Sequence, residues 1–119
     1  MDHVCFAMPV LPGKGDQARA FVRSLDGARR PEFDASERRI GVSKELWFLA
    51  SLPSGEQLIV YMESANFGAA MQAFVGSRDG FDMWFKAELA GVTGVDLNNP
   101  PVNLAPAELL SNYVAGVGV

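Results

Sequence analysis

The sequence predicts a single α+β domain in which strands and helices follow one another in the order β-α-β-β-α-β. Three observations support this fold class. The chain has 119 residues, which is the usual size of one domain. Its composition, 49% hydrophobic and 20% charged, is that of an ordinary globular protein. Hydrophobic runs that suit a strand alternate along the chain with apolar stripes that have the period of a helix.

The first half of the chain contains one predicted strand and a broken helical region. Residues 3–10 form a nearly continuous apolar run that fits a strand buried on both faces. After the turn at 11–15, a helix is indicated by apolar residues at i, i+3, i+4 and i+7: Ala18, Phe21, Val22 and Leu25. Pro31 argues against a straight continuation. A second helical piece is therefore expected over 32–40, and Gly41 is well placed to end it.

A β-hairpin is the strongest local prediction. Residues 44–52 and 57–63 are rich in β-forming residues, and Pro53-Ser54-Gly55 between them is a turn signal. The sequence therefore predicts two adjacent antiparallel strands in the middle of the chain.

Two more helices and a short last strand are expected after the hairpin. Ser64 or Asn66 can cap a helix whose apolar stripe lies within 67–75. A further helix should end near Leu89, and 91–97 suits a final strand. The resulting order is the ferredoxin-like arrangement, a four-stranded antiparallel sheet with helices on one face.

The predicted sheet is apolar on both faces. In the second strand Leu46 and Phe48 point one way while Trp47 and Leu49 point the other, and the first and third strands show the same lack of alternation. A large apolar face is rarely left in water by a monomer, and a second copy is its simplest cover. We therefore expect a homodimer built from a domain over 1–97. An almost uncharged extension, 98–119, is expected to lie on the domain or on the partner subunit.

The layout resembles that of a known superfamily. The residues that carry the resemblance are Leu11-Pro12-Gly13-Lys14, Glu37–Val42, Glu45–Leu49 and Gly55–Glu63. Over residues 3–97 the chain resembles the dimeric α/β-barrel superfamily, and within it small bacterial proteins near the antibiotic-biosynthesis monooxygenase-like group. The resemblance implies a dimeric barrel. It also implies the range of activities found there, which includes cofactor-free monooxygenases, haem-degrading enzymes, isomerase-like proteins and members without known activity.

Composition excludes several classes of function. The net charge is −4 with only 10 Lys and Arg residues, which is a poor basis for nucleic-acid binding. Cys5 is the single cysteine, so no intrachain disulfide is expected. The first residues lack the pattern of a signal peptide, and no apolar run reaches membrane-spanning length. We therefore expect a cytoplasmic protein without a membrane or nucleic-acid partner.

His3 is the only histidine and shares a strand face with Cys5. Histidine is the natural acid or base near neutral pH, but a lone histidine at a strand end is more often simply exposed. One His and one Cys two residues apart do not make a zinc-type spacing, so neither a metal nor a cofactor is expected. His3 and Glu63 are weak candidates for catalysis.

A small hydrophobic ligand is the best functional hypothesis. Trp47, Tyr61 and Glu63 are the candidate ligand-binding residues, with the rings against an aromatic molecule and the carboxylate on its polar edge. The hypothesis is a small-molecule enzyme of monooxygenase-like type. The alternative is a non-catalytic dimeric binding or structural module, in which Trp47 and Tyr61 pack at the dimer interface.

Overall fold

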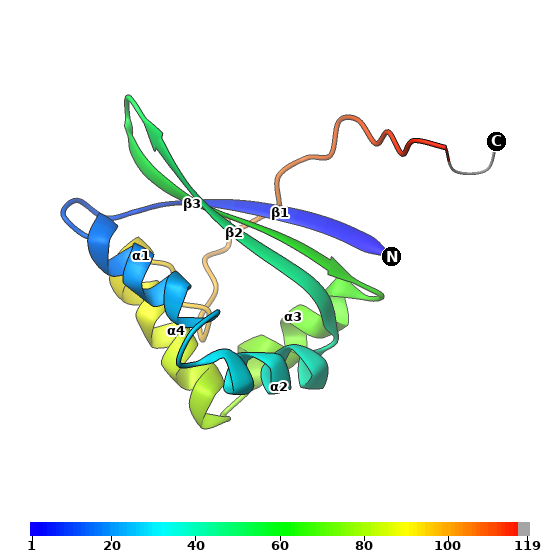
Figure 1. Cartoon of the computed structure of the whole chain (residues 1–119), viewed down its shortest axis with the longest axis horizontal. Helices are drawn as coiled ribbons and strands as arrows, with labels where there is room; N and C mark the ends of the chain where they lie inside the picture. The colour runs from blue at the N-terminus through cyan, green and yellow to red at the C-terminus, as the bar shows by residue number, and fades with distance from the viewer. Residues whose placement is uncertain (117–119) are drawn as a thin grey trace.

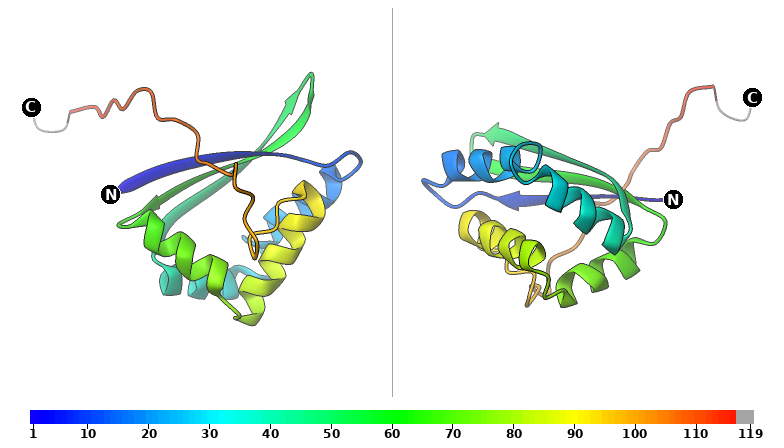
Figure 2. Two further views of the ribbon diagram at one scale, coloured as in Figure 1. Left: turned by 180° about the vertical axis from the view of Figure 1, so that it is seen from behind. Right: turned by 60° about the horizontal axis from the view of Figure 1, so that its bottom comes forward.

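A computed structural model describes residues 1–116 of the chain. Its elements follow in this order: β1 (Asp2–Pro9), α1 (Gly15–Ser24), α2 (Arg30–Ile40), β2 (Val42–Leu52), β3 (Gly55–Ser64), α3 (Phe67–Gly76) and α4 (Gly80–Thr93). The strands form one antiparallel sheet in the order β1-β3-β2. The helices lie on one side of this sheet, as Figures 1 and 2 show, so the other sheet face carries no helix. The α+β class and the ferredoxin-like layering are confirmed.

The helix boundaries follow from local sequence signals. Pro31 lies in the first turn of α2, where its missing N–H is not needed, so the predicted second helical piece begins slightly earlier than expected. Gly41 ends α2 with a φ of 93°, a left-handed conformation that favours glycine. The side chain of Asn66 accepts a hydrogen bond from the Ala69 N–H and caps α3. The predicted helix breaks are confirmed.

The predicted hairpin is also confirmed, and its register contains one irregularity. Leu52 pairs with Gly55 across a two-residue turn, and Leu49 pairs with Leu58. The pairing shifts by one residue between Val42 and Lys44, as in a β-bulge. Because neighbouring residues of a strand point to opposite faces, this extra residue places Val42 on the same side as Trp47 and Leu49, which pack against the core.

The predicted fourth strand is wrong for the described residues, in which the sheet has three strands. Residues 91–93 form the last turn of α4 instead, and Gly94 ends that helix with a φ of 77°. Leu89 and Val92, at most 1% exposed, continue the apolar stripe of α4 into the core. This burial stabilises the helical form.

Without a fourth strand, β1 is an edge of the sheet. The chain beyond α4 crosses this edge, where the Ala107 N–H donates to the Cys5 carbonyl oxygen at 2.6 Å. Farther on it leaves the body as an extended segment (Figure 1). The prediction that 98–119 packs on the domain or a partner falls partly on residues 117–119, which lie outside the described residues.

The core lies between the sheet and the helices. Along each strand, side chains that face the core alternate with side chains that face away from it. In β3 the buried set includes Leu58, Val60 and Met62. On the helix-free face Leu46 is 41% exposed and Phe48 is 55% exposed. Both sheet faces are therefore apolar, as the sequence predicts. Among the described residues, no helix is long and apolar enough to span a membrane.

Candidate functional site

A cavity of about 70 Å³ lies between the sheet and the helices. Its wall is formed by Phe6, Met8, Phe33, Ser36, Glu37, Ile40, Val42, Glu45, Trp47, Val60, Met62, Phe67, Ala70, Met71, Phe74, Phe81, Phe85, Leu89, Leu97 and Leu104. Most of these side chains are aromatic or aliphatic. The polar groups in the wall are one serine hydroxyl, two glutamate carboxyls and the indole N–H of Trp47. An apolar pocket with a few convergent polar groups is the usual form of a small-molecule site.

Two carboxyl groups reach the cavity from different elements. Glu37 lies on α2 with Phe33 and Ile40, which are four residues before and three residues after it on the same inward face. Glu45 lies on β2 and pairs with Met62, which is buried against the helices. In the regular part of β2, Glu45 alternates with Trp47 and Leu49, which pair with Val60 and Leu58, and therefore points inward with them. Helix spacing on α2 and strand alternation on β2 therefore bring the two glutamates to one cavity.

The Glu37 and Glu45 carboxyl groups are hydrogen-bonded to each other. Burial, together with the charge and hydrogen bond of Glu45, raises the pKa of Glu37 to about 9. Burial also raises the pKa of Glu45 to about 7, although the hydrogen bonds from Trp47 and Glu37 oppose this rise. The Trp47 Nε1–H donates to Glu45 Oε2 at 2.8 Å. At neutral pH the two carboxyl groups therefore retain a proton that exposed glutamates would have lost.

A buried polar network lies behind Glu37. Asp82, with 0% exposure, accepts hydrogen bonds from Ser36, from Ser77 at 2.6 Å and from Arg39 at 2.6 Å. Burial favours protonation of Asp82, but these three donors hold its pKa below the ordinary value. Its negative charge is one of the causes that raise the pKa of Glu37. The network therefore positions α2 and helps to keep the carboxyl pair protonated.

The residues predicted as a site lie on two faces of the sheet. Tyr61 pairs with Leu46 on the helix-free face, whereas Trp47 pairs with Val60 and faces the helices. The expectation that Trp47, Tyr61 and Glu63 gather on one face is therefore wrong. The physical reason is that successive side chains of a strand point to opposite faces. Trp47 pairs with Val60, the residue next to Tyr61, so Trp47 and Tyr61 lie on opposite faces of the sheet.

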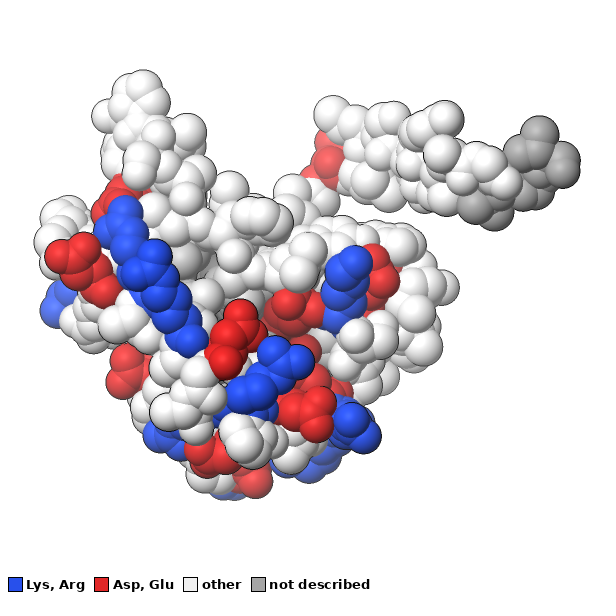
Figure 3. Space-filling model, viewed as in Figure 1, with Lys and Arg blue, Asp and Glu red and all other residues white. Residues whose placement is uncertain are grey.

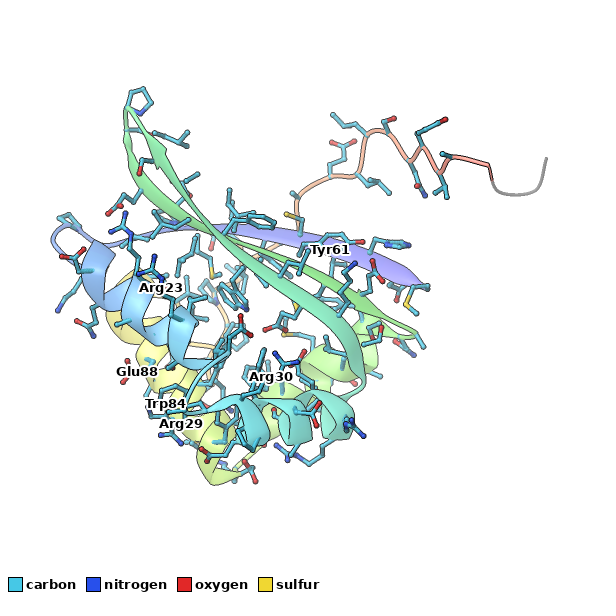
Figure 4. The ribbon with its side chains drawn as sticks, in the orientation of Figure 1. Arg23, Arg29, Arg30, Tyr61, Trp84 and Glu88 are labelled. Carbon is cyan, nitrogen blue, oxygen red and sulfur yellow. The ribbon has the colours of Figure 1, made fainter. Side chains whose placement is uncertain are left out.

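Tyr61 does meet the other predicted candidates. His3 Nδ1 lies 2.7 Å from the Tyr61 hydroxyl, which donates to Glu63 Oε2 at 2.7 Å. The acceptor Glu63 raises the pKa of Tyr61. Tyr61 lies on the sheet (Figure 4), and His3 is 41% exposed, so this cluster lies at the surface of the helix-free face. Within residues 1–116, no three side chains of His, Cys, Asp or Glu gather closely enough to hold a metal ion.

Glu37 was missed as a site residue by sequence reasoning. The available signal was its position at helical spacing with Phe33, Ser36 and Ile40, which places a carboxyl group on an apolar helix face. A glutamate inside an apolar stripe indicates either a helix edge or a buried acid. Only the docking of α2 against β2 shows that Glu37 is a half-buried acid in the cavity wall.

Comparison with known proteins supports the fold and leaves the activity open. No protein-family model matches the chain, and no curated protein sequence matches it. Among solved structures, L-rhamnose mutarotase FA22100 from Formosa agariphila is similar over 96% of this chain and 100% of its own, with a TM-score of 0.63 and 15% identity. Tetracenomycin F2 cyclase from Streptomyces glaucescens, a type-II polyketide cyclase, is similar over 97% of this chain and 99% of its own. Its TM-score is 0.58 and its identity 11%. At such identities the likeness shows the fold alone.

Proposed function

We propose that the protein is a small-molecule enzyme that transfers protons to and from a small, largely apolar cyclic substrate in the cavity between the sheet and the helices. The observation that carries this proposal is the Glu37–Glu45 carboxyl pair, which retains a proton at neutral pH inside an apolar wall. Carboxyl groups whose pKa values are shifted toward neutrality by burial are the usual acids and bases of such reactions. The structural neighbours named above are enzymes of small molecules with the same fold, which is consistent with this class.

The two glutamates have different roles in this proposal. Glu45, whose carboxylate accepts from the Trp47 N–H, is the base that takes a proton from a carbon next to a substrate carbonyl. The C–H electron pair becomes the new C=C bond. The carbonyl π pair then takes the proton that Glu37 donates, which gives an enol. Glu45 is then protonated and Glu37 ionised, and transfer along their hydrogen bond restores the starting state.

The cavity limits the size of the substrate. One water-sized position requires about 10–15 Å³ of such volume, so about 70 Å³ holds roughly five to seven heavy atoms. This is the size of one five- or six-membered ring. Aromatic side chains of the lining such as Trp47 and Phe85 offer ring surfaces against which that ring can lie. The lining thus supports the hydrophobic ligand that the sequence predicts, while the carboxyl pair favours proton transfer as its reaction.

The test is deuterium exchange into cyclohexanone and cyclopentanone in D₂O, followed by NMR at the carbon next to the carbonyl. We expect the wild-type protein to accelerate exchange, and Glu37→Gln or Glu45→Gln to lower the rate by about 10²-fold, the usual contribution of a general acid or base. Glu108→Gln, in the exposed tail, is the matched control and should keep the wild-type rate. Equal rates in all four proteins would reject the proposal.

We also propose that the protein is a homodimer in which the helix-free sheet faces cover one another. The exposed Leu46 and Phe48 side chains and the apolar tail residues Leu110 and Tyr113, at 84% and 86% exposure, support this assembly. Sedimentation should give a dimer for the wild type and a monomer for Phe48→Asp. Ala87→Asp, on the exposed surface of α4, should remain a dimer. A wild-type monomer at micromolar concentration would overturn this assignment. A dimer that neither exchanges ketones nor binds them would favour the non-catalytic module.

A further inference from the structure

A second hollow lies at the surface between α1 and β2. This groove has a volume of about 340 Å³ and is lined by Ala18, Arg19, Val22, Arg23, Trp47, Phe48, Leu49, Ser51 and Leu58. Six of the nine lining residues are apolar, but most of the exposed surface of the groove is polar, and its polar side chains are two arginines and one serine. It is several times larger than the buried cavity, so it has room for the part of a ligand that the cavity cannot hold.

Trp47 lines both the groove and the cavity. Its indole lies against Phe21 and Phe85, with centroids 6.5 Å and 6.0 Å away, and its N–H is held by Glu45. The same ring therefore separates the groove from the carboxyl pair. Among the described residues, Trp47 is the one that the two linings share.

The charged side chains that line the groove are all positive, although the chain is negative overall. The net charge of the protein is −4, yet the groove lining contains two arginines and no aspartate or glutamate. Figure 3 shows a band of Lys and Arg atoms over α1 beside the hairpin. Side chains of one charge at a surface groove attract ligands that carry the opposite charge.

The two arginines differ in their partners. Arg19 is held by Glu56 at 2.7 Å and by Asp16 at 3.3 Å. Arg23, labelled in Figure 4, is exposed on the last turn of α1. Within residues 1–116 its guanidinium takes part in no ion pair. Its donors therefore remain available for an anion, and a guanidinium can bind a carboxylate through two parallel hydrogen bonds.

We propose that the groove binds the anionic group of the substrate whose ring lies in the cavity, and that Arg23 selects for this anion. The inference rests on the proposed function, because the ring occupies the cavity that holds Glu37 and Glu45. The substrate class is then a small cyclic or aromatic compound with a carboxylate on a short apolar linker that passes Trp47. Ser51 supplies a further hydroxyl at the groove wall.

The test compares two ligands that differ in charge and hardly in shape, 3-phenylpropionate and 3-phenylpropanamide. Their affinities are measured by isothermal titration calorimetry at low ionic strength for the wild type, Arg23→Gln and Arg30→Gln. We expect the wild type to bind the carboxylate about fivefold more tightly than the amide, as suits a partly exposed ion pair. Arg23→Gln should bind both equally. Arg30→Gln should keep the preference, because Arg30 lies outside the groove and pairs with Asp26.

Two outcomes would overturn the inference. One is a wild-type protein that shows no preference for the carboxylate, including one that binds neither compound. The other is a preference that survives in Arg23→Gln. Either result leaves the acid–base proposal standing if Glu37→Gln still abolishes ketone exchange. Conversely, a carboxylate preference that depends on Arg23, without any exchange activity, would support a binding groove and reject the proposed reaction.

Discussion

Replacement of Glu37 by glutamine should remove most of the pH dependence of stability above about pH 5. The reason is the half-buried carboxyl pair, in which burial and the neighbouring Glu45 raise the pKa of Glu37 above its ordinary value of 4.5. A carboxyl group with a raised pKa in the folded protein contributes stability that is fully present below the unfolded pKa. That contribution is lost as the pH rises toward the folded pKa, because the native state then holds a proton that the unfolded chain has released.

The size of the effect follows from the number of protons that the native state binds in excess of the unfolded chain. We count one extra native proton, that of Glu37, because its pKa of about 9 keeps it bound throughout the range from about pH 5.5 to about pH 7. Glu45, whose pKa is about 7, ionises toward the upper end of this range and adds to the loss. One extra proton changes the free energy of unfolding by about 1.4 kcal/mol for each pH unit. From about pH 5.5 to about pH 7 the wild type should therefore lose about 2 kcal/mol of stability. Glutamine is neutral throughout and can donate its amide N–H to Glu45, so the variant should lose far less.

Urea denaturation at several pH values between these limits measures the effect directly. Glu108→Gln, which changes a glutamate in the exposed tail, is the matched control and should follow the wild-type profile. A wild-type stability that stays level or rises from about pH 5.5 to about pH 7 would refute the reasoning, since it would mean that the pair holds no extra proton. So would a Glu37→Gln variant with the full wild-type slope.

Two further predictions concern the scaffold that holds the site. The buried Lys86 donates to the carbonyl oxygens of Phe74, Val75 and Ser77 at 2.9–3.2 Å. Lys86→Met leaves these carbonyls unsatisfied and should lower the free energy of unfolding by about 3 kcal/mol. A loss below about 0.5 kcal/mol in urea denaturation would contradict this role. Gly41→Ala should lower the free energy of unfolding by about 1 kcal/mol, because a φ of 93° is strained for alanine. Gly76→Ala, at a position without positive φ, should leave the stability unchanged or raise it slightly. Thermal unfolding compares the two variants, and equal effects would argue against backbone strain at Gly41.

Local chemistry made much of the fold predictable. The hairpin between β2 and β3 follows from two β-rich runs around Pro53 and Ser54, and the helix breaks follow from Pro31 and Gly41. These signals act over a few residues, so a sequence reports them directly. The fourth strand was predicted wrongly because Gly91 and Gly94 indicated a break. Burial of Val92 against the core outweighs the cost of Gly91 inside the helix.

The candidate site was less predictable than the fold. Tyr61, Glu63 and His3 do cluster, as strand parity and pairing allow, but on the face opposite to Trp47. Assigning faces across two strands requires the register, and a shift of one residue reverses every side chain. Glu37 could be read only as a glutamate at helical spacing among apolar residues.

The sequence by itself determined the class of fold, the central hairpin, the helix boundaries at Pro31 and Gly41, and a sheet with two apolar faces. These depend on composition, on periodicity and on the backbone preferences of single residues. The tertiary structure alone decided that Glu37 and Glu45 share a buried cavity and that Trp47 divides it from the arginine groove. That outcome depends on how α1 and α2 dock on β2 and on the pairing of β2 with β3, which are contacts that the sequence does not report directly.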